Sequence, residues 1–153
     1  MERHGRAFFE LGLGDVLEEA MTITEAHVVQ TAALCNDYNV LHTDAPRMQH
    51  SRFGQRIVHA ALINGLMIGV YSKVFYDTDI STVEFSASYT APVYIDDTIT
   101  MRWTVEALDP KPKLDGGLVE LSGEVIKPDG TVTSKMSAKL LVGNKTIFEW
   151  AQS

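Results

Sequence analysis

A carboxylate and an imidazole lie five residues apart in the most polar segment of the chain, residues 36–44. They belong to Asp37 and His42, and Asn39 lies between them. When such groups converge on one water molecule they can act as general base and general acid, and histidine titrates near neutral pH. Capping and turn hydrogen bonds explain Asp37 and Asn39 equally well, so the spacing alone leaves both interpretations open.

A second candidate lies where a strongly apolar stretch begins, at His59, Ala60 and Ala61. If a helix starts here, its first backbone amides are free to bind an oxyanion, and the positive end of the helix dipole adds to the attraction. These amides could therefore bind a carbonyl oxygen on which negative charge develops. The alternative for the His59 side chain is a structural role, which is the more common one for a histidine at a helix start.

Three arginines, Arg47, Arg52 and Arg56, fall within ten residues of an otherwise acidic chain. Guanidinium groups bind phosphates well, so this cluster predicts a site for the phosphates of coenzyme A or of a phosphopantetheine arm. The alternative is that the three side chains form a solvated face of a loop.

Other reactive groups are less informative. His42, Asp44, His50 and His59 follow no familiar metal-ligand spacing, so we expect no metal site. Cys35 is the only cysteine, and the apolar residues before it favour a small buried side chain over a reactive thiol. One cysteine cannot form an intramolecular disulfide, which is typical of proteins in a reducing compartment.

Length and charge limit the classes of protein to which the chain can belong. Its 153 residues suffice for one domain, and we expect a single domain over residues 1–153. The formal net charge of -7 excludes a general basic surface for nucleic acid. The most apolar segment, residues 57–70, is shorter than the roughly 20 residues that a membrane span needs, and residues 1–10 do not resemble a signal peptide. We therefore expect a cytoplasmic protein.

Two helices are predicted to position these groups. The first begins after Thr24, which can cap it, and ends near Asn36, just before the candidate carboxylate. A polar loop follows over residues 43–56. The second helix runs from about Val58 to Phe75 and is apolar all round, so we expect it to be buried on all sides. Gly65 and Gly69 then predict close packing against a sheet.

From residue 78 onward, apolar and polar residues alternate with a period of two, which is typical of strands with one buried face. Four segments show this alternation: residues 83–89, 99–105, 119–125 and 132–142. Short connections between them predict an antiparallel sheet. An apolar helix followed by a long antiparallel sheet predicts an α+β hotdog fold, in which the sheet wraps around one long central helix. Its exposed edge strand favours a homodimer or a larger homo-oligomer.

Two stretches of the sequence resemble the MaoC-like dehydratases, which include the (R)-specific enoyl-CoA hydratases. Residues 31–44 are similar to the family motif Gly-Asp-x-Asn-Pro-x-His-x-Asp, and residues 52–59 to Phe-Gly-x-x-Ile-x-His-Gly. Weaker similarity covers nearly the whole chain, at residues 23–26, 91–93 and 97–98.

The resemblance implies that water is added to, or removed from, an enoyl thioester, giving a (3R)-3-hydroxyacyl thioester. Asp37 and His42 match the catalytic pair of the family, Asn39 matches the asparagine that supports the histidine, and Ala60 takes the place of the glycine whose amide binds the thioester oxygen. The implied partner is an acyl-CoA or acyl-carrier thioester, and no metal or redox cofactor is used.

Four residues depart from the family pattern. Asn36 and Val40 replace a glycine and a proline, which should make the turn before His42 less rigid. Ala60 keeps the oxyanion amide but adds a methyl group, and Asp96 replaces a glycine at a position we expect on the surface.

Two other functions stay open on the sequence. The same acid/base groups could direct water at the thioester carbonyl, which would make the protein a hotdog thioesterase. The altered turn could instead leave a non-catalytic subunit that only binds acyl groups.

Overall fold

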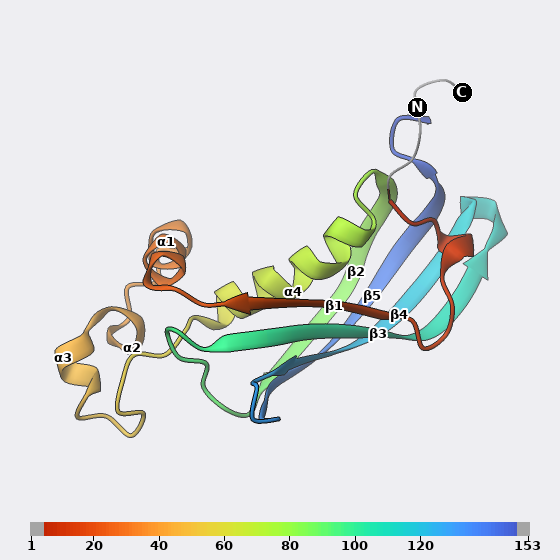
Figure 1. Cartoon of the computed structure of the whole chain (residues 1–153). Helices are drawn as coiled ribbons and strands as arrows, with labels where there is room; N and C mark the ends of the chain where they lie inside the picture. Colours follow the sequence, from red (N-terminus) through yellow and green to blue (C-terminus); the bar gives the residue numbers. More distant parts are fainter. Residues whose placement is uncertain (1–4, 150–153) are drawn as a thin grey trace.

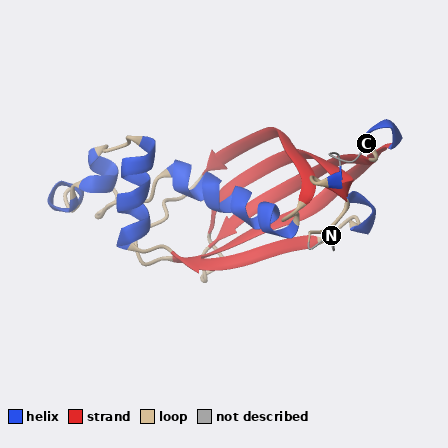
Figure 2. Cartoon of the chain, turned by 90° about the horizontal axis from the view of Figure 1, so that it is seen from above, coloured by secondary structure: helices blue, strands red, loops and turns tan. Residues whose placement is uncertain are grey.

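A five-stranded antiparallel sheet curls around helix α4 (Ala60–Val74), and the strand order is β1-β3-β4-β5-β2 (Figure 1). The computed structural model describes residues 5–149. The strands are β1 (Val16–Thr22), β2 (Thr78–Tyr89), β3 (Thr98–Lys111), β4 (Gly116–Ile126) and β5 (Val132–Thr146). The predicted α+β hotdog fold is confirmed. Figure 2 shows α4 lying along one face of the sheet.

The core forms where alternate residues of β3 and β4 face α4. Ile99, Met101, Trp103 and Val105 of β3 are all at most 2% exposed, as the period of two predicts. The indole nitrogen of Trp103 donates to the Met67 carbonyl oxygen at 2.7 Å, so the largest buried side chain also ties the sheet to the helix backbone.

The close approach of helix and sheet occurs at Gly123 of β4, which pairs with Trp103. A Cβ atom there would lie 2.6 Å from the indole ring and 2.7 Å from the Met67 side chain. Gly65 and Gly69 have no neighbouring heavy atom within 4 Å of such a Cβ position. The prediction that these two glycines pack against the sheet is therefore wrong, because they lie on the other face of α4.

Helix α4 is buried on one face only in the single chain. Ile63, Met67, Val70 and Tyr71 are buried, whereas positions 60, 61 and 65 are exposed. The prediction of burial on all sides does not hold for the chain alone.

Three helices lie together beyond one end of α4 (Figure 1). They are α1 (Glu25–Cys35), α2 (Val40–Thr43) and α3 (Ala45–Met48). Helix α3 lies within the segment predicted as a loop, residues 43–56, and α2 ends where that segment begins. Two short 3-10 turns complete the described elements, at Phe8–Glu10 and Pro112–Leu114.

Helix α1 has the predicted limits, with Thr24 at its N-cap and Asn36 at its C-cap. Cys35 is exposed in its last turn, so the prediction of a buried cysteine is wrong. Across residues 5–149, no helix is long and apolar enough to cross a membrane.

Candidate active site

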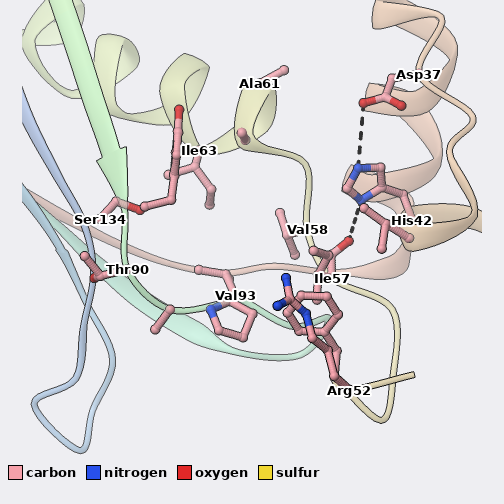
Figure 3. A pocket seen from close by; sticks show the side chains of 16 residues that line it. Asp37, His42, Arg52, Ile57, Val58, Ala61, Ile63, Thr90, Val93 and Ser134 are labelled. Atoms are coloured by element: carbon pink, nitrogen blue, oxygen red, sulfur yellow. Dashed lines mark hydrogen bonds and ion pairs between the residues drawn. The ribbon is translucent and has the colours of Figure 1, made fainter. Parts of the chain in front are cut away.

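Asp37 and His42 face each other across the turn between α1 and α2, as the sequence predicts. Oδ2 of Asp37 lies 3.7 Å from Nε2 of His42, beyond direct hydrogen-bond length but close enough for both to contact one water molecule (Figure 3). The His42 side chain is 9% exposed and the Asp37 side chain 44% exposed. A buried imidazole therefore meets a carboxylate that is still accessible to ligand.

The tautomer of His42 is set by the backbone of Ile57. Nδ1 of His42 lies 2.7 Å from the Ile57 carbonyl oxygen, and since a carbonyl only accepts, Nδ1 carries the hydrogen. Nε2 of the neutral ring is then the free acceptor, and it faces Asp37. The Ile57 amide in turn donates to the Leu41 carbonyl at 3.0 Å, so two hydrogen bonds join α2 to the segment before α4.

His59 supports both members of the pair. Its ring is stacked on that of His42, with centroids 3.7 Å apart and planes inclined by 25°. Its Nε2 donates to the Asp37 carbonyl oxygen at 3.1 Å. The residue is 0% exposed, and its Nδ1 has no hydrogen-bond partner among residues 5–149. These contacts place His59 against both members of the pair, and it does not line the cavity.

Asn39 acts on His42 through the start of α2. Its side-chain oxygen accepts from the Leu41 amide at 3.0 Å, and its carbonyl oxygen accepts from the His42 amide at 2.9 Å. Val40 occupies the first position of α2, where the proline of the motif would be favoured. The Asn39 cap, which the family motif also has, therefore orders the start of α2 without this proline.

The three predicted arginines have different surroundings. Arg56 forms a bidentate ion pair with Glu25, at 2.9 and 2.5 Å, and its Nη1 also donates to the His42 carbonyl oxygen at 3.3 Å. The hydrogen bonds from Arg56 lower the pKa of Glu25, and the same bonds raise the pKa of Arg56. Arg47 is 76% exposed and lies 3.9 Å from Asp44. Arg52 stands over the Phe53 ring, 4.7 Å from its centroid.

A cavity of about 520 Å³ opens between this loop region, the start of α4 and the ends of β2 and β5. Figure 3 shows Asp37 and His42 on one side of it and Thr90 and Ser134 on the other. Its polar lining residues are Asp37, His42, Arg52, Tyr89, Thr90 and Ser134. The others are apolar and include Leu41, Phe53, Val58, Ile63 and Val93. The cavity is therefore a mainly apolar chamber with the acid/base pair at one wall.

The amino end of α4 also borders the cavity, through Ala60 and Ala61. The Ile63 amide makes the first bond of the helix, to the His59 carbonyl at 3.3 Å, so the amides at positions 60 and 61 precede the hydrogen-bonded ladder. These free amides therefore lie at the wall of the cavity, and their use as an oxyanion site stays a prediction.

Asp37, His42 and His59 also form a possible metal cluster, with ligand atoms within 4.8 Å of one another. Their arrangement suits a metal poorly. The two rings are stacked with planes inclined by only 25°, so the in-plane lone pairs of their nitrogens converge poorly on one tetrahedral ion. Each ring also has one nitrogen bonded to a carbonyl. The geometry favours proton transfer over metal binding.

The sequence matches the family model of the MaoC like domain over residues 13–121. The chain belongs to the MaoC-like family. It is 31% identical to an (R)-specific enoyl-CoA hydratase of Rhodospirillum rubrum over 106 residues, which cover 69% of this chain and 74% of that protein. It is 29% identical to the (R)-specific enoyl-CoA hydratase of Aeromonas caviae, over 66% of this chain and 82% of that one. Among solved structures, the unliganded R-hydratase of Pseudomonas aeruginosa superposes with a TM-score of 0.81 at 22% identity, over 92% of this chain and 88% of that chain.

Two departures from the MaoC-like motif have a structural explanation. Asn36 and Asp96 replace glycines, and both have left-handed backbones, with φ of 51° and 71°. Asparagine and aspartate are the non-glycine residues that best tolerate this conformation. The turn that presents Asp37 is therefore kept without the glycine of the family motif.

Two supports of the site were not expected from the sequence: the ion pair of Glu25 with Arg56, and the stacking of His59 on His42. Neither contact can be predicted from local sequence spacing, because the two partners are 31 residues apart in the ion pair and 17 residues apart in the stacked pair.

Proposed function

We propose that this protein hydrates an enoyl thioester to a (3R)-3-hydroxyacyl thioester and catalyses the reverse dehydration, using Asp37 and His42 as its acid/base pair. The observation that carries the proposal is the 3.7 Å approach of Nε2 of His42 to Oδ2 of Asp37 at the wall of an apolar cavity. The family relationship supports a hydro-lyase, since the MaoC-like relatives are named as hydratases and dehydratases.

In this mechanism a water molecule binds between Asp37 and His42. One water hydrogen is held by the carboxylate, while the free Nε2 lone pair of His42 accepts the proton as the oxygen bonds to the β-carbon. The π electrons of the double bond move toward the thioester carbonyl and form an enolate. The protonated pair then returns a proton to the α-carbon on the same face, so no net proton is consumed.

The developing oxyanion is stabilised at the amino end of α4. The amide of Ala60, preceding the first intrahelical bond, donates to the thioester oxygen, and the helix dipole adds a favourable field. The methyl group of Ala60 narrows the cavity beside this amide but leaves the amide free to donate.

The carrier is coenzyme A or an acyl-carrier group. Arg47 is available to bind the phosphates of this carrier, because its guanidinium is largely exposed and lies 3.9 Å from the carboxylate of Asp44. Arg56 contributes differently: its ion pair with Glu25 fixes the chain at His42.

We further propose a homodimer that works in the cytoplasm. Strand β2 lies at one edge of the sheet, and Val83 and Tyr89 on it are about half exposed. Gly65 and Gly69 lie on the face of α4 that is turned away from the sheet. This face is a second apolar surface, which a second copy of the chain would cover.

Incubation with crotonyl-CoA tests the reaction. Loss of the enoyl absorbance without release of free thiol is the expected result. Release of free thiol would indicate the thioesterase instead. Binding without turnover of short, medium or branched enoyl-CoAs would indicate a non-catalytic acyl-binding subunit.

A further inference from the structure

Arg52 is an exposed residue that lines the cavity of the acid/base pair, and its positive charge is unpaired among the described residues. Figure 3 shows its side chain reaching from the loop toward Val58 and Val93. Among the described residues its guanidinium has no carboxylate or hydrogen-bond partner, and its one contact of note is the Phe53 ring, 4.7 Å from the ring centroid. The charge is therefore accessible to a ligand.

The other two arginines of this segment differ in that respect. Arg56 is neutralised by Glu25 at 2.5 Å, and Arg47 lies near Asp44 and does not line the cavity. Asp37 is the one carboxylate among the described residues that line the cavity, and the proposed mechanism uses it to hold the attacking water. Arg52 is thus a solvent-exposed cation that lines a mainly apolar cavity, and no carboxylate of the described residues pairs with it.

A planar guanidinium presents a fork of donors, which suits bidentate binding of an oxyanion. Two parts of a thioester substrate could provide this anion, a carboxylate on the acyl group or a phosphate of the carrier. The pantetheine arm puts a long chain of bonds between the sulfur and its first phosphate. A carboxylate on a short acyl chain is only a few bonds from the reacting carbons, so it would stay within a chamber of about 520 Å³.

We propose that the substrate is the monothioester of a short dicarboxylic acid, and that Arg52 binds its free carboxylate. This inference rests on the proposed function for the reaction, but the ligand preference it predicts can be measured without turnover. The carboxylate of the acyl group would be anchored by Arg52 while Asp37 and His42 act on the double bond.

Calorimetry with two saturated five-carbon ligands tests the proposal. Glutaryl-CoA and valeryl-CoA carry the same carrier and differ by one carboxylate, and neither can be hydrated. We expect the wild-type protein to bind glutaryl-CoA about 10-fold or more tightly than valeryl-CoA, and Arg52→Ala and Arg52→Gln to lose this preference. Lys113→Ala, which removes one exposed positive charge from the 3-10 turn after β3, is the matched control and should keep it.

Equal affinity of the wild-type protein for the two ligands would overturn the proposal. So would an Arg52→Ala variant that loses affinity for both ligands equally, which would assign Arg52 to the phosphates of the carrier. If glutaryl-CoA is preferred through Arg52 but no enoyl-CoA is hydrated, the proposed reaction fails while the carboxylate site stands.

Discussion

His59 and His42 form a stacked pair of imidazoles, with ring centroids 3.7 Å apart, in which only His42 reaches the cavity. His59 is 0% exposed and donates to the Asp37 backbone at 3.1 Å. One buried ring therefore fixes the plane of the proposed base and the position of its carboxylate partner. His59 is a positioning residue, because its contacts are with the pair and not with the cavity.

Replacing His59 should affect both stability and turnover. His59→Ala leaves a buried void and should lower the free energy of unfolding by about 2–4 kcal/mol. We expect kcat to fall about 10–100-fold with little change in KM, since His42 loses its fixed orientation. Urea unfolding and steady-state kinetics measure the two effects.

His59→Phe is the matched variant, because it keeps a ring for stacking and removes the hydrogen bond to Asp37. It should retain more stability and more activity than His59→Ala. Equal kcat in His59→Ala and the wild-type protein would show that stacking does not orient His42.

The ion pair of Glu25 and Arg56 should make stability depend on pH. The hydrogen bonds from Arg56 hold the pKa of Glu25 below its ordinary value of 4.5, so the folded state favours the charged carboxylate. This contribution is fully present above the ordinary pKa and is lost as pH falls through the lowered folded value. Because Glu25 is 54% exposed, solvent screening limits the contribution to about 0.5–1 kcal/mol.

Urea unfolding of the wild-type protein and of Glu25→Gln, from pH 7 to pH 3, measures this contribution. The variant should be less stable at pH 7, and the difference should shrink as the solution becomes acidic. A difference that grows toward low pH would contradict the assignment of the pKa shift to Arg56.

Asn36 should tolerate glycine but not a β-branched residue. Its φ of 51° is left-handed, and Asp37 follows directly. Asn36→Gly should leave the free energy of unfolding within about 0.5 kcal/mol, whereas Asn36→Val should lower it by about 1–2 kcal/mol. Thermal unfolding and hydration rates check this pair. A Val variant as stable and active as the Gly variant would show that the turn does not need its left-handed residue.

The sequence predicts much of this fold because burial follows a period of two over the first half of β3 and over most of β4 and β5. Strand β1 was not predicted, since only Leu17 of its seven residues is buried and its alternation is weak. The prediction about Gly65 and Gly69 was wrong because an apolar helix does not reveal which face meets the sheet. Gly123, whose missing side chain makes room for Trp103, became identifiable only when β4 was seen to pair with β3.

The candidate site was predictable in part for a similar reason. Asp37, Asn39 and His42 lie in one short motif, and the structure brings the first and last within 3.7 Å. The roles of Glu25 and His59 depend on contacts made by the folded chain, with Arg56 and His42, that local spacing does not encode. Exposure of Cys35 likewise depends on how α1 is oriented, which its composition leaves open.

The hydration rate of Asp37→Asn and His42→Ala with crotonyl-CoA tests the central claim most directly. Asp109→Asn, which removes an exposed carboxylate of β3, serves as the control, and circular dichroism checks that each variant is folded. The proposed mechanism predicts that kcat/KM falls by about 10²–10⁴-fold in both site variants and is unchanged in the control. A folded Asp37→Asn or His42→Ala variant that hydrates crotonyl-CoA at the wild-type rate would contradict it.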